Sequence, residues 1–147
     1  MWLAALQYLF SSKGNYRLHS PFVYDFYERV IRGGKSIDGK QVETLRREMM
    51  RSQQQVKIVD YGAGSRKRGK SQKAQSLGHL ARTASRRANE GEFLLRLSRF
   101  CQASRMLELG THLGISAMYQ CLGNPNAEVV SREGNPALAK IAEDGFQ

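Results

Sequence analysis

The chain is poor in cysteine, and this excludes two common classes of small protein. Its 147 residues include two cysteines, Cys101 and Cys121, and both fall in predicted helices with apolar neighbours. Such cysteines indicate small buried hydrophobic residues rather than a disulfide framework or a metal-binding pair. His79 has no cysteine or carboxylate at metal-ligand spacing, so no metal site is expected.

Long hydrophobic runs are also absent. Residues 2–10 are largely apolar, but this run is too short to span a bilayer and is interrupted by Gln7. It lacks a preceding basic region and an Ala-x-Ala-like cleavage site, which argues against a signal peptide. We therefore expect a cytoplasmic protein with no membrane segment, in which residues 2–10 form a short packed helix.

Acidic residues are scarce relative to basic ones. The chain has 13 Asp and Glu against 23 Lys and Arg, a net charge of +10, and residues 66–105 supply +9 of it. This segment could bind RNA phosphates, a phosphorylated substrate or an acidic partner protein. A solvated loop is the alternative interpretation, because no aromatic residue interleaves with the densest charges, at 66–73, to stack a base.

The most informative pattern begins with residues 106–109, a short apolar run followed by glycine. It predicts a buried parallel strand. Gly110 and Gly114 permit a tight turn that approaches a ligand closely, and apolar residues then recur at helical spacing. Residues 127–131 predict the next strand. Glu133 lies 23 residues after Gly110, where dinucleotide-binding folds place the acid that binds ribose hydroxyls.

The motif Glu108-x-Gly110-x-x-x-Gly114, with Glu133, resembles the first two motifs of class I S-adenosylmethionine-dependent methyltransferases. The segment 91–97 that leads into it is similar to the catechol and caffeoyl-CoA O-methyltransferase branch. Two segments further upstream resemble a bacterial methyltransferase subgroup. They are His19-Ser20-Pro21-Phe22 and Asp60-Tyr61-Gly62-Ala63-Gly64-Ser65-Arg66.

This resemblance implies roles for particular residues. Glu108, Gly110, Thr111 and Gly114 would surround the methionine end of S-adenosylmethionine, with Ser116 as a further cofactor-binding residue. Glu133 would accept hydrogen bonds from the ribose hydroxyls. The resemblance also implies a small-molecule methyl acceptor, with candidate contacts at His19 and Ser20. It identifies no catalytic base.

The fold class that follows is α/β, with a helical N-terminal cap before an incomplete Rossmann-like parallel sheet. Residues 1–104 form the cap, with a short strand near 56–60 and a basic loop at 65–75. Residues 105–147 form the first βαβα part of the sheet domain. Because the resembled family uses seven strands, we expect an N-terminal fragment, truncated after the second strand and helix; a small self-sufficient fold is the alternative.

Periodicity places the helices of the cap. Ser20-Pro21 begins one helix, which Gly33-Gly34 ends. Asp38 with Gln41 resembles a capping box and opens a second helix. A weak pattern predicts a helix over 76–88, and a stronger one predicts a helix over 90–102. The inward residues would be Val42, Leu45 and Met49 in the second helix, and Phe93, Leu94, Leu97, Phe100 and Cys101 in the last.

A second glycine-rich turn, Gly62-Ala63-Gly64, also follows an apolar run that ends in an acid. The residues after it have no apolar periodicity, so they cannot form the buried helix that a cofactor loop must start. We interpret these glycines as turn residues, with a border of the active site as the alternative.

The leading hypothesis is an S-adenosylmethionine-dependent methyltransferase that transfers a methyl group to oxygen of a small molecule. The main alternative is a noncatalytic remnant or binding module that holds nucleic acid or a partner through residues 66–105. An RNA methyltransferase would use both features.

Overall fold

The computed structural model describes residues 19–59 and 72–146 and contains two compact units, residues 1–33 and 34–147. In the first unit, α2 (Pro21–Phe26) continues into a π-helical turn, η2 (Tyr27–Ile31). The Ser20 hydroxyl accepts the Val23 N–H at 3.4 Å, and Pro21 takes the first helical position. The predicted start of this helix is confirmed.

The second unit is a mixture of helices and two small sheets. Its elements, in chain order, are α3 (Gly39–Arg51), β1 (Gln55–Val59), β2 (Gln72–Ser76), α4 (Leu77–Thr83), α5 (Ala88–Cys101), β3 (Arg105–Leu109), α6 (Ile115–Gly123), β4 (Glu128–Arg132) and α7 (Pro136–Gly145). β1 and β2 pair antiparallel, whereas β3 and β4 pair parallel. No helix among the described residues is long and apolar enough to cross a membrane.

The parallel pair confirms the predicted strand, helix and strand after residue 105. Glu108 lies opposite Ser131 and Leu109 opposite Arg132, and α6 makes the crossover that a parallel connection requires. The carboxyl ends of both strands therefore lie at the same edge of the sheet. α7 follows β4, as the predicted βαβα order requires, with Asn135 as its cap.

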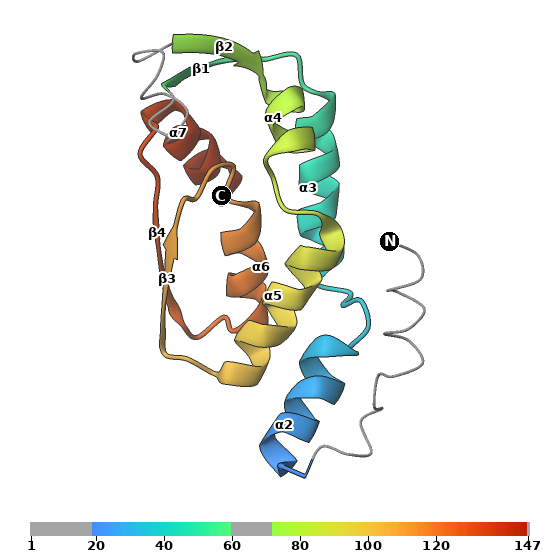
Figure 1. The fold of residues 1–147 in the computed structure, drawn as a ribbon. Helices are drawn as coiled ribbons and strands as arrows, with labels where there is room; N and C mark the ends of the chain where they lie inside the picture. The colour runs from blue at the N-terminus through green and yellow to red at the C-terminus, as the bar shows by residue number, and fades with distance from the viewer. Residues whose placement is uncertain (1–18, 60–71, 147) are drawn as a thin grey trace, which may run out of the picture. The chain divides into compact units, whose positions relative to one another are not determined.

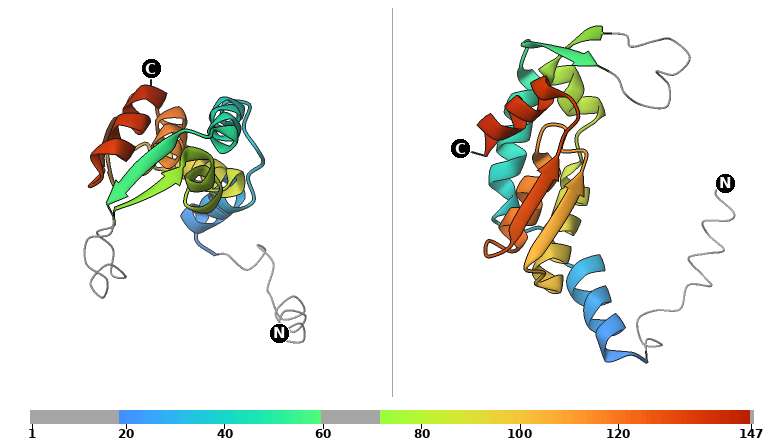
Figure 2. Two further views of the ribbon diagram at one scale, coloured as in Figure 1. Left: turned by 90° about the horizontal axis from the view of Figure 1, so that it is seen from above. Right: turned by 90° about the vertical axis from the view of Figure 1, so that its left-hand side faces the viewer.

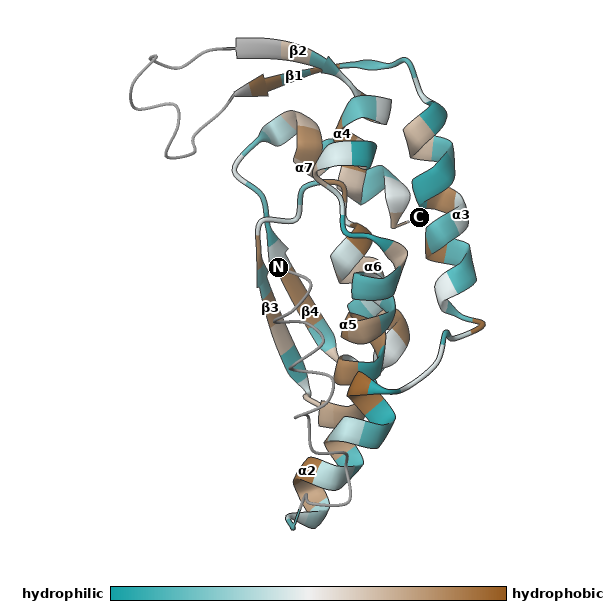
Figure 3. Ribbon diagram, turned by 45° about the vertical axis from the view of Figure 1, so that its right-hand side comes forward, coloured by the Kyte–Doolittle hydropathy of each residue, from teal (hydrophilic) through white to brown (hydrophobic). Residues whose placement is uncertain are grey.

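Helices cover one face of this sheet. α5 and α6 lie side by side behind β3 and β4 in two views at right angles (Figures 1 and 2). Leu107 and Leu109, on the other face, are 67% and 79% exposed, and Val130 is 37% exposed. Figure 3 shows apolar residues along parts of both strands, and those on this face are exposed. The prediction of a buried strand was wrong for this face, because alternate residues of a strand point to opposite sides and the helices cover the other side.

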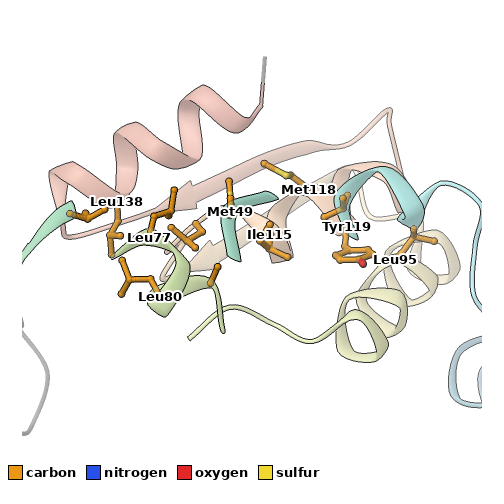
Figure 4. Packing of buried hydrophobic residues seen from close by; sticks show 12 residues of the cluster. Met49, Leu77, Leu80, Leu95, Ile115, Met118, Tyr119 and Leu138 are labelled. Atoms are coloured by element: carbon orange, nitrogen blue, oxygen red, sulfur yellow. The ribbon is translucent and has the colours of Figure 1, made fainter. Parts of the chain in front are cut away.

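The core gathers apolar side chains from both the cap helices and the region after residue 105. Figure 4 shows the buried cluster, whose labelled members are Met49, Leu77, Leu80, Leu95, Ile115, Met118, Tyr119 and Leu138. Val42 and Met49 of α3 are buried, and Leu45 is half-buried, as their spacing predicted.

The buried face of α5 differs from the predicted one. Gly91, Leu95 and Ser98 are buried, whereas Cys101 is exposed and the four other predicted residues are half-buried. Small residues let α5 approach α6: a Cβ on Gly91 would lie 2.1 Å from the Tyr119 ring. The Ser98 hydroxyl donates to the Gln120 carbonyl at 2.8 Å. The spacing of hydrophobic residues predicted the wrong buried face of α5, because close contact between two helices favours small residues.

Three further predictions for the cap were wrong. Asp38 makes no capping hydrogen bond; its carboxylate instead accepts from the Ser36 hydroxyl at 3.2 Å and from Arg99 at 3.0 Å. The end of the predicted basic loop 65–75 forms β2, because β1 supplies a pairing partner. The helix predicted over 76–88 is the shorter α4, and residues 84–87 connect it to α5.

Candidate functional site

The turn between β3 and α6, residues 110–114, is here called the glycine loop. Gly110, His112 and Gly114 have φ values of +96°, +52° and +80°. Glycine adopts this left-handed region at no steric cost, whereas a histidine there stores roughly 1–3 kcal/mol of strain. The backbone N–H groups of Gly110 and Thr111 donate to the Arg132 carbonyl at 2.9 and 3.2 Å. These bonds hold the loop against the end of β4.

The two glycines of the loop have different surroundings. A Cβ on Gly114 would lie 3.2 Å from the Ala142 Cβ and 3.4 Å from the Phe146 ring, so α7 packs directly on this end of the loop. A Cβ on Gly110 would have no atom of the described residues within 4 Å. Gly114 thus serves packing as well as backbone conformation, and Gly110 borders open space.

Glu133 joins the glycine loop to the start of α7. One carboxylate oxygen accepts the His112 N–H at 2.7 Å and the other accepts the Asn135 N–H at 2.8 Å. Asn135 in turn accepts from the first turn of α7, at Ala137 and Leu138. A carboxylate has about four acceptor directions, so Glu133 retains capacity for two further donors.

Glu108 lies at the centre of a hydrogen-bond network beneath the loop. Its carboxylate accepts from the Ser116 and Ser131 hydroxyls, both at 2.5 Å, and from the Gln120 amide at 3.2 Å. Thr111 extends the network, since its hydroxyl lies 2.6 Å from that of Ser131. β3, α6 and β4 are thereby tied together below the glycine loop.

All six residues predicted to bind the cofactor therefore come together at the carboxyl edge of the parallel sheet. They are Glu108, Gly110, Thr111, Gly114, Ser116 and Glu133. Their contact with a cofactor stays a prediction. The hydrogen bonds of Glu108 and Ser116 are directed to each other and to the protein, so both residues shape the loop from below.

His112 is a polar residue held in a partly apolar setting. Burial lowers its pKa, and the negative charge of Glu133 opposes that shift. The Nδ1 atom is buried and has no hydrogen-bond partner among the described residues. The imidazole is therefore favoured in its neutral form at the middle of the loop.

A cleft of about 660 Å³ borders the glycine loop, a size typical of small-molecule sites. The loop and the start of α6 form one side. The other side consists of residues 82–87, Glu90 and Arg46. This second side was not predicted from the sequence, because the pattern over 76–88 predicted that residues 84–87 lie inside a helix. The cluster of arginines just before the helix over 90–102 was the available signal.

A second cavity, of about 350 Å³, meets the first at Thr111. Ser131 and Glu133 also line it, together with small apolar side chains of α6 and α7. Glu133 thus borders open space as well as its two backbone donors.

The remaining candidates lie in the first unit or outside the described residues. Ser20 caps α2, and the substrate contact predicted for it and for His19 stays a prediction. Gly62 and Gly64, with the charges at 66–71, lie outside the described residues. No group of three histidine, cysteine, aspartate or glutamate side chains within 19–59 and 72–146 is arranged to hold a metal ion.

Comparison with known proteins gives one partial similarity. No family model matches the chain, and no solved structure matches it. A catechol O-methyltransferase from Niastella koreensis is 38% identical over 56 residues, which are 37% of this chain and 25% of that protein. The match thus spans about a quarter of the relative's length. The matched segment of this chain is thus similar to part of one methyltransferase.

Proposed function

We propose that this chain binds S-adenosylmethionine at the glycine loop and belongs to an enzyme that methylates oxygen of a small molecule. The observation that carries the proposal is the hydrogen bond of 2.7 Å between Glu133 and the His112 N–H. This bond brings Glu133, which follows β4, to the glycine loop, which follows the neighbouring strand β3. Ligands of open α/β sheets bind at this carboxyl edge.

The residues present fit the cofactor in two respects. Gly110 leaves its side of the loop open, and Glu133 keeps acceptor capacity beside a cavity that can admit a ribose. When bound, S-adenosylmethionine supplies a methyl group activated by a sulfonium. The chain's own contribution is to fix the cofactor's position, so that an acceptor oxygen in the larger cleft can approach in line.

The similarity to a catechol O-methyltransferase supports oxygen as the acceptor atom. The two parallel strands and the helices on one of their faces are consistent with the first part of a Rossmann-like sheet. In this proposal the described residues provide the cofactor half of the site, and none of them is assigned as the base.

The test is calorimetric binding of S-adenosylhomocysteine to the full chain and to Glu133→Ala. Hydrogen bonds to a charged group contribute about 1.5–3 kcal/mol, so we expect at least about tenfold weaker binding. Glu128→Ala is the matched control, because it removes an exposed carboxylate at the opposite end of the same strand. Thermal unfolding establishes that each variant is folded. A folded wild-type chain without measurable binding would overturn the proposal.

A further inference from the structure

The cleft beside the glycine loop carries an unusual concentration of arginines. Arg46, Arg82, Arg86 and Arg87 all line it and are here called the arginine wall. They come from α3, α4 and the connection to α5, and they lie across the cleft from residues 110–113. Glu90 is the acidic residue on this lining.

Two of the four charges are already matched. Arg46 donates to both carboxylate oxygens of Glu43 at 2.8 Å, and the two side chains are each 15% exposed. These hydrogen bonds lower the pKa of Glu43 and keep the pair ionised. Arg86 lies 3.7 Å from Glu90 in a more exposed pair.

The other two charges have no carboxylate partner among the described residues. Arg82 is held in place by donating to the Met50 carbonyl, a neutral acceptor. Arg87 precedes α5, and its backbone N–H, rather than its guanidinium, is what Glu90 accepts at 3.4 Å. The lining of the cleft therefore includes two arginines, Arg82 and Arg87, whose charges no carboxylate of the described residues matches.

Guanidinium groups in a cleft attract anions, because walls of one sign concentrate the field within it. Their planar donors match the paired oxygens of a carboxylate or phosphate. S-adenosylmethionine itself carries a net positive charge, since its sulfonium and ammonium outnumber its one carboxylate. Charge balance in the occupied cleft therefore calls for an anion on the second ligand.

We infer that the arginine wall, through Arg82 and Arg87, binds a carboxylate or phosphate group of the methyl acceptor. This inference rests on the proposed function and narrows its substrate to small acidic molecules. The lining also argues against a nucleic acid as the occupant. No Phe, Tyr or Trp of the described residues lines the cleft, and stacking on such rings is the usual means of holding an unpaired base.

The probe is 4-hydroxybenzoate, compared with uncharged 4-hydroxybenzyl alcohol, each titrated into the chain with and without saturating S-adenosylhomocysteine. We expect the acid to bind at least about tenfold more tightly than the alcohol, and more weakly as salt is raised. Arg82→Gln/Arg87→Gln should remove this preference while leaving S-adenosylhomocysteine binding within about twofold. Inorganic phosphate should compete with the acid.

The matched control is Arg51→Gln/Arg105→Gln, which removes the same charge from exposed positions that do not line the cleft. It should keep the preference for the acid. Because Arg82 also bonds the Met50 carbonyl, Arg87→Gln alone provides a second test that leaves this contact intact.

Three outcomes would overturn the inference. Equal binding of acid and alcohol would show that the wall does not select anions. A parallel loss of S-adenosylhomocysteine binding in Arg87→Gln would assign the wall to the cofactor's own carboxylate. Tighter binding of a single-stranded oligonucleotide, lost in the same variant, would assign it to nucleic acid. Absence of S-adenosylhomocysteine binding to the wild type contradicts the proposed function instead, and the two failures are thus distinguishable.

Discussion

The carboxylate of Glu133 accepts the backbone N–H of His112 at 2.7 Å, so the acid that follows β4 holds the middle of the loop that follows β3. His112 has a left-handed backbone, and its ring is partly buried. This contact thus helps to hold the loop's conformation and places a negative charge beside its single titratable residue.

His112 makes stability depend on pH. Burial lowers its pKa, so the unfolded chain binds a proton near about pH 6.5 while the folded chain resists it. Stability is therefore complete above that value and is lost as pH falls from it toward the lower pKa of the folded state. We expect the thermal midpoint to drop more in the wild type than in His112→Asn between about pH 7.5 and about pH 5.5. Asparagine tolerates the left-handed backbone.

The control for this experiment is His79→Asn, which alters an exposed residue of α4. It should retain the wild-type response to pH. Equal pH dependence of the wild type and His112→Asn would contradict the assignment.

Replacement of Gly91 by alanine should damage the contact between α5 and α6. The added Cβ would lie 2.1 Å from the Tyr119 ring, which is fully buried. We expect a loss of about 1–3 kcal/mol in the free energy of unfolding, measured with urea, even though alanine favours helix. Gly34→Ala, where a Cβ meets nothing within 4 Å, should change it little. Similar values for the two variants would contradict this packing.

The two ends of the glycine loop should respond unequally to alanine. Gly110→Ala adds backbone strain alone, at a cost of about 1–3 kcal/mol. Gly114→Ala adds the same strain and a contact of 3.2 Å with Ala142, so it should cost more. Combining Gly114→Ala with Ala142→Gly should recover the packing part, as a double-mutant cycle of unfolding free energies would measure. An additive cycle would mean that α7 does not press on the loop.

The open face of the parallel sheet should tolerate polar residues. Leu107 is 67% exposed, and we expect Leu107→Thr to change the free energy of unfolding by no more than about 0.5 kcal/mol. Leu95→Ala, at a fully buried site on α5, should cost about 2–5 kcal/mol. A large loss in Leu107→Thr would show that this face is covered in solution.

Sequence patterns predicted the strand, glycine loop, helix and strand after residue 105, because apolar periodicity and glycine placement are local properties. The exposure of one face of these strands could not be predicted in the same way. The run Met106-Leu107-Glu108-Leu109 has the composition of a buried strand, but burial depends on whether helices cover both faces.

Two other features depended on contacts that local patterns do not encode. The segment Gln72–Ser76 is polar and forms a strand because β1 lies beside it. α5 buries Gly91 because Tyr119 of α6 requires the space, and it buries Ser98 where Gly123 of α6 comes close. The arginine wall could not be predicted for a related reason. The position at which α4 ends determines whether residues 84–87 lie within a helix or connect it to α5.

The network around Glu108 also bears on the order in which the site forms. Its partners Ser116, Gln120 and Ser131 all follow closely in the chain, so little loop-closure entropy opposes their assembly. In the arginine wall, Arg82 bonds the Met50 carbonyl of α3 across 32 residues of chain, which closes a longer loop. We therefore expect refolding to build the glycine loop early and the cleft late, with the slow step in the docking of the cap helices.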